Sequence, residues 1–149
     1  MTLNTGGTIG QTQAIQAGSL TAKTLNDAGA SIVLNNGSNN TSNIDLRSRN
    51  AADTANAAGA VVYVDTNGFN VAKISTTSNA TLQAGGNVSE TGTIEAAGLQ
   101  LLGNATYALT APGHSVTTLA AKISGGLGFN NSLYTGLTMG RVNGTSGIT

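Results

Sequence analysis

Apolar residues along this chain come in short pairs that alternate with polar or small residues. Examples of these pairs are Leu99/Leu101, Tyr107/Leu109, Ala121/Ile123, Leu127/Phe129 and Leu137/Met139. A spacing of two puts both members of a pair on one face of a β-strand, whereas a helix would repeat its apolar positions every three or four residues. The pattern therefore predicts many short strands and no long helix.

The segments between these pairs are rich in turn-forming residues. They read "NNGSNN", "NDAG", "DTNG", "APG" and "GG", and Gly and Asn tolerate the backbone conformations that tight turns need. A sandwich of hairpins is one alternative, but its strands usually run about 5–6 residues and carry larger core side chains. Shorter fragments with small aliphatic residues favour a parallel β-helix whose coils of roughly 20 residues stack at about 4.8 Å. We expect about six to eight coils, and hence a rod on the order of 30 to 40 Å long.

Self-comparison indicates two internal modules. "LNTGGTIGQTQAIQAGSL" (3–20) matches "LQAGGNVSETGTIEAAGL" (82–99), and later "GFNVAKI" (68–74) matches "GLTMGRV" (136–142). Repetition of this kind is the signature of repeat architectures. We interpret residues 1–149 as one β-helix segment of a longer repeat rod, with modules at about 3–74 and 82–142.

One stretch breaks the pattern. "DLRSRNAADTANAAGA" (45–60) holds two arginines and two aspartates and has no close match in the second module. We expect an irregular excursion on the rod, with room for one helical turn; a functional excursion is the alternative interpretation.

The low and balanced charge of the chain limits the kinds of partner that it can bind. Charged residues make up 8% of the chain, with six basic and six acidic side chains, against roughly 25% charged residues in typical domains. This balance leaves no basic stripe for phosphates, so we expect no nucleic-acid partner. No apolar run approaches the roughly 18 residues of a membrane span, so we expect no membrane insertion. With 39% hydrophobic residues and one proline, the chain also lacks the composition of a disordered segment.

Candidate chemistry is sparse. Cysteine is absent, which excludes disulfides and thiolate metal sites. His114, the single histidine, lies in "TAPGHSVTT" without a nearby carboxylate, so we expect a surface turn rather than a triad or a metal site. Glu90 and Glu95 are the best candidates for the paired carboxylates of a sugar-cleaving β-helix. We nevertheless expect no catalytic, cofactor-binding or metal-binding residues, and no enzyme.

Asn-x-Ser/Thr sequons are numerous, as expected in a chain rich in Asn and Thr. The longest polar turn contains Asn36, Asn39 and Asn40, and an exposed sequon in a secreted protein can carry a sugar. These three residues are the candidate glycosylation sites.

The segment "GGNVSETGTIEAAGLQLLGNATYALTAPGHSVTTLAAKISGGLGF" (85–129), followed by "LTMGRVNGTSGIT" (137–149), resembles the repeat region of filamentous haemagglutinin-like exoproteins of the two-partner secretion pathway. The resemblance implies a right-handed parallel β-helix, export through an outer-membrane secretion partner, and a bacterial cell-surface or secreted location. It also implies a role as an adhesin or as a stalk that displays something at its tip. Contact-dependent toxin-delivery proteins share similar stalk repeats, so the resemblance does not fix one activity. The secretion domain of such exoproteins is not present in the chain.

Two functions from different classes follow. The first is a non-enzymatic stalk or adhesin segment that contacts a host-cell or carbohydrate receptor and self-associates head to tail through its unpaired strand edges. The second is a carbohydrate-binding or carbohydrate-cleaving β-helix. That function would need outward aromatic side chains, for which the candidates are Tyr63, Phe69, Tyr107, Phe129 and Tyr134.

Overall fold

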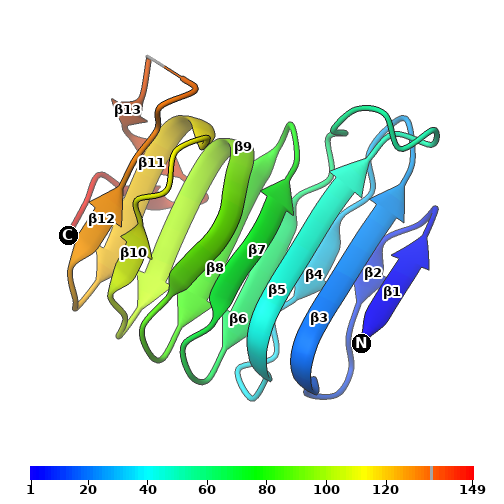
Figure 1. Ribbon diagram of the computed structural model, residues 1–149, viewed down its shortest axis with the longest axis horizontal. Coiled ribbons are helices and arrows are strands. Elements are labelled where there is room, and N and C mark those ends of the chain that lie inside the picture. The colour runs from blue at the N-terminus through cyan, green and yellow to red at the C-terminus, as the bar shows by residue number, and fades with distance from the viewer. Residues whose placement is uncertain (135) are drawn as a thin grey trace.

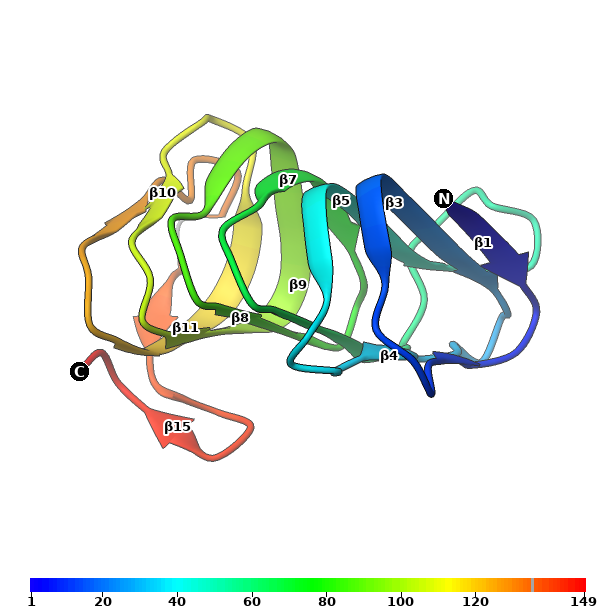
Figure 2. The same cartoon turned by 90° about the horizontal axis from the view of Figure 1, so that it is seen from below.

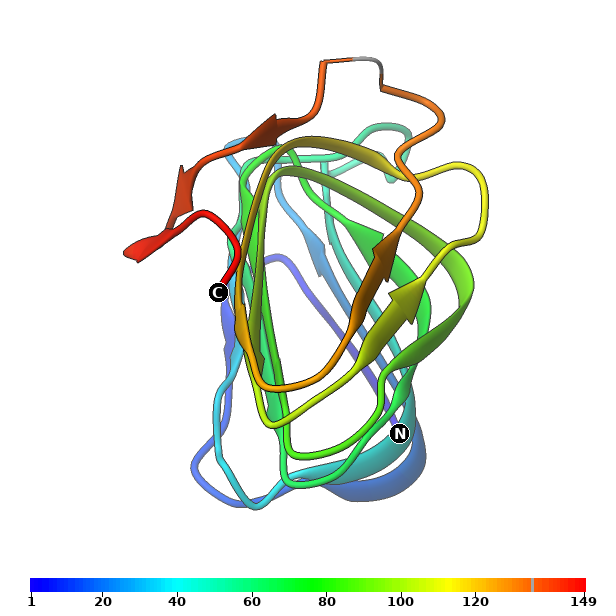
Figure 3. The same cartoon turned by 90° about the vertical axis from the view of Figure 1, so that its left-hand side faces the viewer.

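The computed structural model describes residues 1–134 and 136–149. This part of the chain is all-β, contains no helix, and forms a right-handed parallel β-solenoid of about seven turns (Figures 1 and 3). The predicted fold class and number of coils are thereby confirmed. Figure 2 shows the coils side by side along the long axis, with the N-terminus in the first coil and the C-terminus beside the last.

The strands are short except where one strand turns a corner of the solenoid. Their bounds are β1 (Thr2–Thr5), β2 (Ile9–Gly10), β3 (Gln16–Leu25), β4 (Ile32–Leu34), β5 (Asn40–Arg49), β6 (Val61–Asp65), β7 (Asn70–Ser75), β8 (Asn79–Ala84), β9 (Ser89–Gly103), β10 (Tyr107–Leu109), β11 (Ser115–Ile123), β12 (Leu127–Phe129), β13 (Thr138–Met139), β14 (Arg141–Val142) and β15 (Thr145–Ser146).

Two stacked faces account for most of the hydrogen-bonded pairing. Face A contains β1, β3, β5, β7 and the first half of β9, and face B contains β2, β4, β6, β8 and the second half of β9. β9 and β11 cross from one face to the other and pair in parallel with each other. A smaller pair, β10 with β12, completes the last coils.

Aliphatic ladders fill the interior, because each coil places one residue directly above its equivalent in the coil before. On face A one ladder is Leu3, Ala22, Leu46, Ile74 and Ile94. On face B one ladder is Leu34, Tyr63, Leu82, Leu101 and Ala121. Nearly all of these side chains are fully buried, so burial of apolar surface from coil to coil holds the fold together.

The repeating unit of the backbone is the coil. Residues in register lie between 19 apart, as for Thr2 and Thr21, and 29 apart, as for Ile32 and Val61. Leu3 and Leu82, which the self-comparison pairs, lie in the two different ladders given above. The two modules are therefore similar because their coils use the same kinds of residue in the same order. They do not occupy equivalent positions in the solenoid.

The predicted excursion begins later than expected and contains no helical turn. Residues 45–49 belong to β5, and the irregular loop covers 50–60. A second excursion lies near the C-terminus, where β14 and β15 form an antiparallel hairpin outside the solenoid path (Figure 3). Its Asn143 hydrogen-bonds Asn79 and Thr81, and Val142 is buried against face B. The hairpin thus contacts coils that precede it by some 60 residues.

Candidate functional sites

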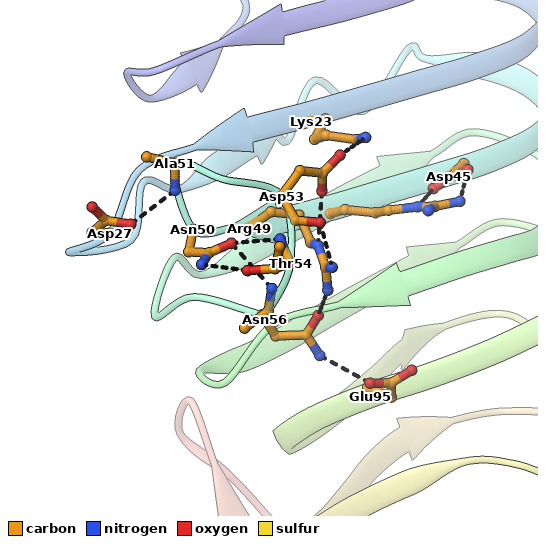
Figure 4. A network of polar contacts seen from close by, with 12 residues as sticks. Lys23, Asp27, Asp45, Arg49, Asn50, Ala51, Asp53, Thr54, Asn56 and Glu95 are labelled. Atoms are coloured by element: carbon orange, nitrogen blue, oxygen red, sulfur yellow. Dashed lines mark hydrogen bonds and ion pairs between the residues drawn. The ribbon is translucent and has the colours of Figure 1, made fainter.

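The outer surface of face A gathers most of the charged side chains. Lys23 of β3, Asp45 and Arg47 of β5, Lys73 of β7 and Glu95 of β9 occupy outward positions between the inward ladder residues. Figure 4 shows how the loop 50–60 folds over this surface. Lys23 and Arg47 are like charges in register on neighbouring strands, and each has an acidic partner nearby, Asp53 for Lys23 and Asp45 for Arg47. These pairs offset the like-charge repulsion.

The loop 50–60 connects coils that are not neighbours. Asp53 accepts from Lys23 at 2.6 Å and from Arg49 at 3.0 Å. Asn56 accepts from Arg49 and donates to Glu95 at 2.9 Å. These contacts span four coils, from β3 to β9. The face is therefore a structural network in which each charged side chain has an oppositely charged partner within the protein.

Glu95 has a pKa that the network lowers. Burial alone would raise the pKa, but hydrogen bonds from Lys73 and Asn56 outweigh it. A carboxylate whose pKa is lowered in the folded state adds stability above its unfolded pKa and loses that contribution as the pH falls through the folded value.

We expect Glu95→Gln to destabilise the protein by about 1 kcal/mol or less at pH 7, because the pair with Lys73 is partly exposed and screened by solvent. Urea unfolding at pH 7 and at pH 3 measures the effect. The difference between the variant and the wild type should shrink as the pH falls from 7 to 3, because protonation of Glu95 through its lowered folded pKa removes the charge that Gln lacks. A difference that is as large at pH 3 as at pH 7 would contradict the electrostatic explanation.

The two glutamates do not form a catalytic pair. Glu95 lies outside on face A, bound to Lys73 and Asn56, whereas the side chain of Glu90 is 4% exposed and its Oε2 lies 2.6 Å from Nε2 of His114. The two carboxylates thus have different partners and different exposure, and the arrangement for paired acid–base catalysis on a shared substrate is missing.

The prediction that His114 lies in a surface turn is wrong, because its side chain is fully buried. Its ring stacks on Phe129 with centroids 5.2 Å apart, and its Nδ1 accepts the backbone N–H of Ile94 at 2.9 Å. His114 follows Ile94 by 20 residues, the common coil length here. Counting one coil onward from Ile94 would have placed His114 at an inward position. The sequence analysis missed this because the residues next to His114 in the sequence are polar.

A second buried polar cluster was missed by the sequence analysis. Asp65 accepts hydrogen bonds from the Tyr63 hydroxyl at 2.6 Å and from the backbone N–H groups of Thr41 and Asn67 at 2.9 Å. The Tyr63 hydroxyl also lies 2.7 Å from that of Thr41. Burial raises the pKa of Tyr63, and the hydrogen bond to Asp65 adds to the rise. Every oxygen of this carboxylate is occupied, so the cluster has a structural role.

Four of the five aromatic candidates for sugar stacking are unsuitable. Tyr63, Phe69 and Tyr107 are buried in the core, and Phe129 is half-buried beneath His114. Tyr134 alone is exposed, at 39%.

Tyr134 borders a shallow groove of about 320 Å³. The groove is lined by Asn56, Thr76, Thr77, Glu95, Ala96, Ala97, Ser115, Thr117 and Tyr134. An aromatic ring beside hydroxyls, an amide and a carboxylate is chemistry that suits a sugar ring, although both oxygens of Glu95 already have partners within the protein.

The three sequon asparagines differ in accessibility. Asn40 is exposed and Asn36 is half-buried, whereas Asn39 is fully buried. The amide nitrogen of Asn39 donates to Gln11 at 3.0 Å, to the Leu34 carbonyl at 3.2 Å and to the Val64 carbonyl at 2.9 Å. Asn39 is therefore not available for modification in the folded protein, and Asn36 and Asn40 stay as predicted sites.

Comparison with known proteins identifies no relative: no family model, no curated protein and no solved structure matches this chain. Within residues 1–134 and 136–149, no helix is long and apolar enough to cross a membrane. The same residues include no group of three or more His, Asp or Glu side chains arranged to hold a metal ion. The function must therefore be argued from the fold and its surfaces.

Proposed function

We propose that this chain is a non-enzymatic structural stalk segment, with adhesin character, of a secreted bacterial surface exoprotein. The observation that supports this proposal is the continuous parallel pairing of the coils from β1 through β13, in which the register shifts only at Ala72 of β7. Each coil supports its neighbours, and two excursions tie coils that are further apart. Such a body keeps a fixed length and orientation, which a spacer between a cell and its target requires. Export through an outer-membrane partner and contact with a host-cell or carbohydrate receptor belong to the same proposal.

A distance measurement between the ends tests the stalk function. The chain has no cysteine. A double variant with Gln13→Cys and Leu133→Cys can therefore be spin-labelled at two unique exposed sites, one in the first coil and one in the last. We expect one narrow distance on the order of 30 Å from a coil spacing of about 4.8 Å. A broad or multimodal distribution of label-to-label distances under native conditions would overturn the rigid spacer. The same labelled chain unfolded in urea shows how broad the distance distribution of a flexible chain is.

Head-to-tail self-association follows from the open ends. β1 and β2 each have one partner strand, so their outer edges present unpaired backbone groups. At the other end, within residues 1–134 and 136–149, β12 has one partner strand, β10, and its outer edge is open in the same way. The two ends are different surfaces, and their contact would repeat without closing and produce filaments. Sedimentation over a wide concentration range tests this; a strictly monomeric protein at high concentration would contradict it.

Carbohydrate binding is the second candidate, and the groove beside Tyr134 is the observation that favours it. Binding of the wild type to a panel of oligosaccharides, compared with Tyr134→Ala, separates the two functions. A sugar that binds the wild type and not the variant would favour the carbohydrate-binding function. Adhesion of protein-coated beads to epithelial cells that persists in Tyr134→Ala would favour the stalk with an adhesive surface elsewhere.

A further inference from the structure

Two inward ladder positions in the C-terminal half are occupied by ionisable residues. Glu90 stands in register with Val71, in the ladder that begins with Leu20 and Ile44. His114 stands one coil after Ile94 and is fully buried. Aliphatic residues would satisfy the apolar interior at both positions, and buried ionisable groups are costly unless they are paired. The pair therefore needs an explanation beyond packing.

The hydrogen bonds around the pair involve equal numbers of donors and acceptors. The Ile94 N–H donates to Nδ1 of His114, which must therefore be unprotonated. The Ala111 N–H donates to Oε1 of Glu90. The remaining contact joins Nε2 of His114 to Oε2 of Glu90 at 2.6 Å, although the ring N–H does not point straight at the oxygen. Three donors thus face three acceptors when the imidazole is neutral and the carboxylate is ionised.

A further proton on the imidazole would sit on Nδ1, where it would oppose the Ile94 N–H and break that buried hydrogen bond. An unsatisfied buried donor is expensive. A proton on Glu90 would leave each oxygen a lone pair for its present contact, but it would remove the carboxylate charge that attracts the ring.

Besides Glu90, the backbone of Leu109 is a hydrogen-bond partner of the ring, and this contact raises the pKa of His114. Phe129 of β12 covers one face of the imidazole. β10 contributes Tyr107, whose hydroxyl donates to the carbonyls of Leu82 and Leu102. Lys73 of β7 and Glu90 are the charged groups that act on the ring. Burial lowers the pKa of His114, more strongly than the attraction of Glu90 raises it, and Lys73 lowers it further.

We propose that Glu90 and His114 form an acid-sensitive latch that holds the turn 110–114 against β9 near neutral pH and releases it when the pair takes up a further proton. The turn is attached to the solenoid by the contacts of this pair and by the pairing of β11 from Ser115 onward. The next coil rests on the same turn, because Leu133 N–H donates to the His114 carbonyl at 3.2 Å and Gly113 N–H donates to Ser132 Oγ at 2.9 Å. Release would loosen residues 110–114 together with 130–134, including the groove at Tyr134. This regulatory property is independent of the proposed stalk function.

The direction of the pH dependence follows from linkage. In the unfolded or released chain His114 takes up a proton near its ordinary pKa of about 6.5, whereas in the latched state its pKa is lower. The released state therefore binds more protons below that value, and the latch weakens as the pH falls from about 6.5 toward the folded pKa.

Amide hydrogen exchange measured by NMR between pH 7.5 and pH 5 tests the latch. After correction for the intrinsic rates, exchange of the Ile94 and Ala111 amides should accelerate by up to about tenfold per pH unit below pH 6.5, as one-proton linkage requires. The amide of Leu46, in the same face A ladder but far from the pair, is the matched reference and should change less. Protection of Ile94 and Ala111 that stays constant, or changes no more than that of Leu46, would overturn the proposal.

A variant and a spectroscopic measurement complete the test. In His114→Gln the amide oxygen and nitrogen replace an acceptor and a donor without titrating, so the acceleration between pH 6.5 and pH 5 should disappear. Persistence of the same acceleration in this variant would overturn the proposal. The ¹⁵N shifts of the wild-type imidazole provide an independent outcome: Nε2 protonated and Nδ1 bare at pH 7.5 support the latch, and the opposite tautomer refutes it even if His114→Gln does not fold.

Discussion

Replacing Gly92 with alanine is expected to destabilise the protein by about 3 kcal/mol, the upper end of the cost of overpacking a tight interior. Gly92 lies in β9 where the pairing with β7 is irregular: Val71 pairs with Glu90 and Lys73 with Thr93, so Thr91 and Gly92 together lie opposite Ala72. A Cβ at Gly92 would lie 1.7 Å from the Ala72 carbonyl oxygen. Backbone atoms cannot rotate away as a side chain can, so the two coils would have to separate.

Gly18→Ala is the matched control for this prediction. Gly18 also lies in a face A strand, β3, and its added Cβ would have no neighbour within 4 Å. Its substitution should be neutral or stabilise the protein by up to about 1 kcal/mol through the unfolded chain. Urea unfolding of the two variants in parallel measures the difference. Equal midpoints for Gly92→Ala and Gly18→Ala would contradict the close approach of β7 and β9.

The architecture could be predicted because its cause is local. Pairs such as Leu99/Leu101 alternate with period two, and turns rich in Gly and Asn separate them, so short strands at coil spacing follow from the residues alone. The register could not be predicted in the same way. It depends on how many residues each turn contains, and a loop such as 50–60 lengthens one coil without changing the apolar pattern on either side. Matching residues such as Leu3 and Leu82 therefore lie on different faces.

The buried polar groups were the hardest part to predict, because their partners come from other coils. His114 is surrounded in the sequence by Gly, Ser and Thr, and its carboxylate partner Glu90 lies a coil earlier. Glu95 was paired with Glu90 by proximity in sequence, but the bend of β9 and the alternation of its side chains direct one inward and the other outward. A comparison of each residue with the position one coil away is the signal that would have found Glu90 and His114.

The two excursions give this solenoid a property that simple stacking lacks. In a repeat protein each unit usually contacts only its neighbours, so stability is a sum of local terms and the ends can fray independently. Here the loop 50–60 connects β3, β5 and β9, and the hairpin of β14 and β15 connects the last coil to β8 and β9. Coils that share no interface are therefore coupled, and we expect this coupling to increase the cooperativity of unfolding, as the proposed stalk function would require.

Asn39→Ala is expected to have an effect of about 4 kcal/mol, because it leaves several buried backbone groups without partners and each costs about 1–3 kcal/mol. Asn39 Oδ1 accepts the buried N–H of Ile15 at 2.8 Å, and its Nδ2 donates to the carbonyls of Leu34 and Val64. Gln11 completes the cluster from the first coil. One side chain thus bridges three successive coils at a corner where strand pairing stops, and alanine can replace none of these bonds.

The neighbouring Asn40→Ala is the control, because Asn40 is exposed in β5 and its substitution should change the stability by no more than about 0.5 kcal/mol. Urea unfolding of both variants measures the difference in stability. Mass spectrometry of the wild-type protein from a glycosylating host shows which of the sequon asparagines carry a sugar. The structure leads us to expect unmodified Asn39 in the native protein, whatever the occupancy of Asn36 and Asn40. Equal stabilities for the two variants, or a sugar on Asn39 of the native protein, would show that this corner is more open than its hydrogen bonds indicate.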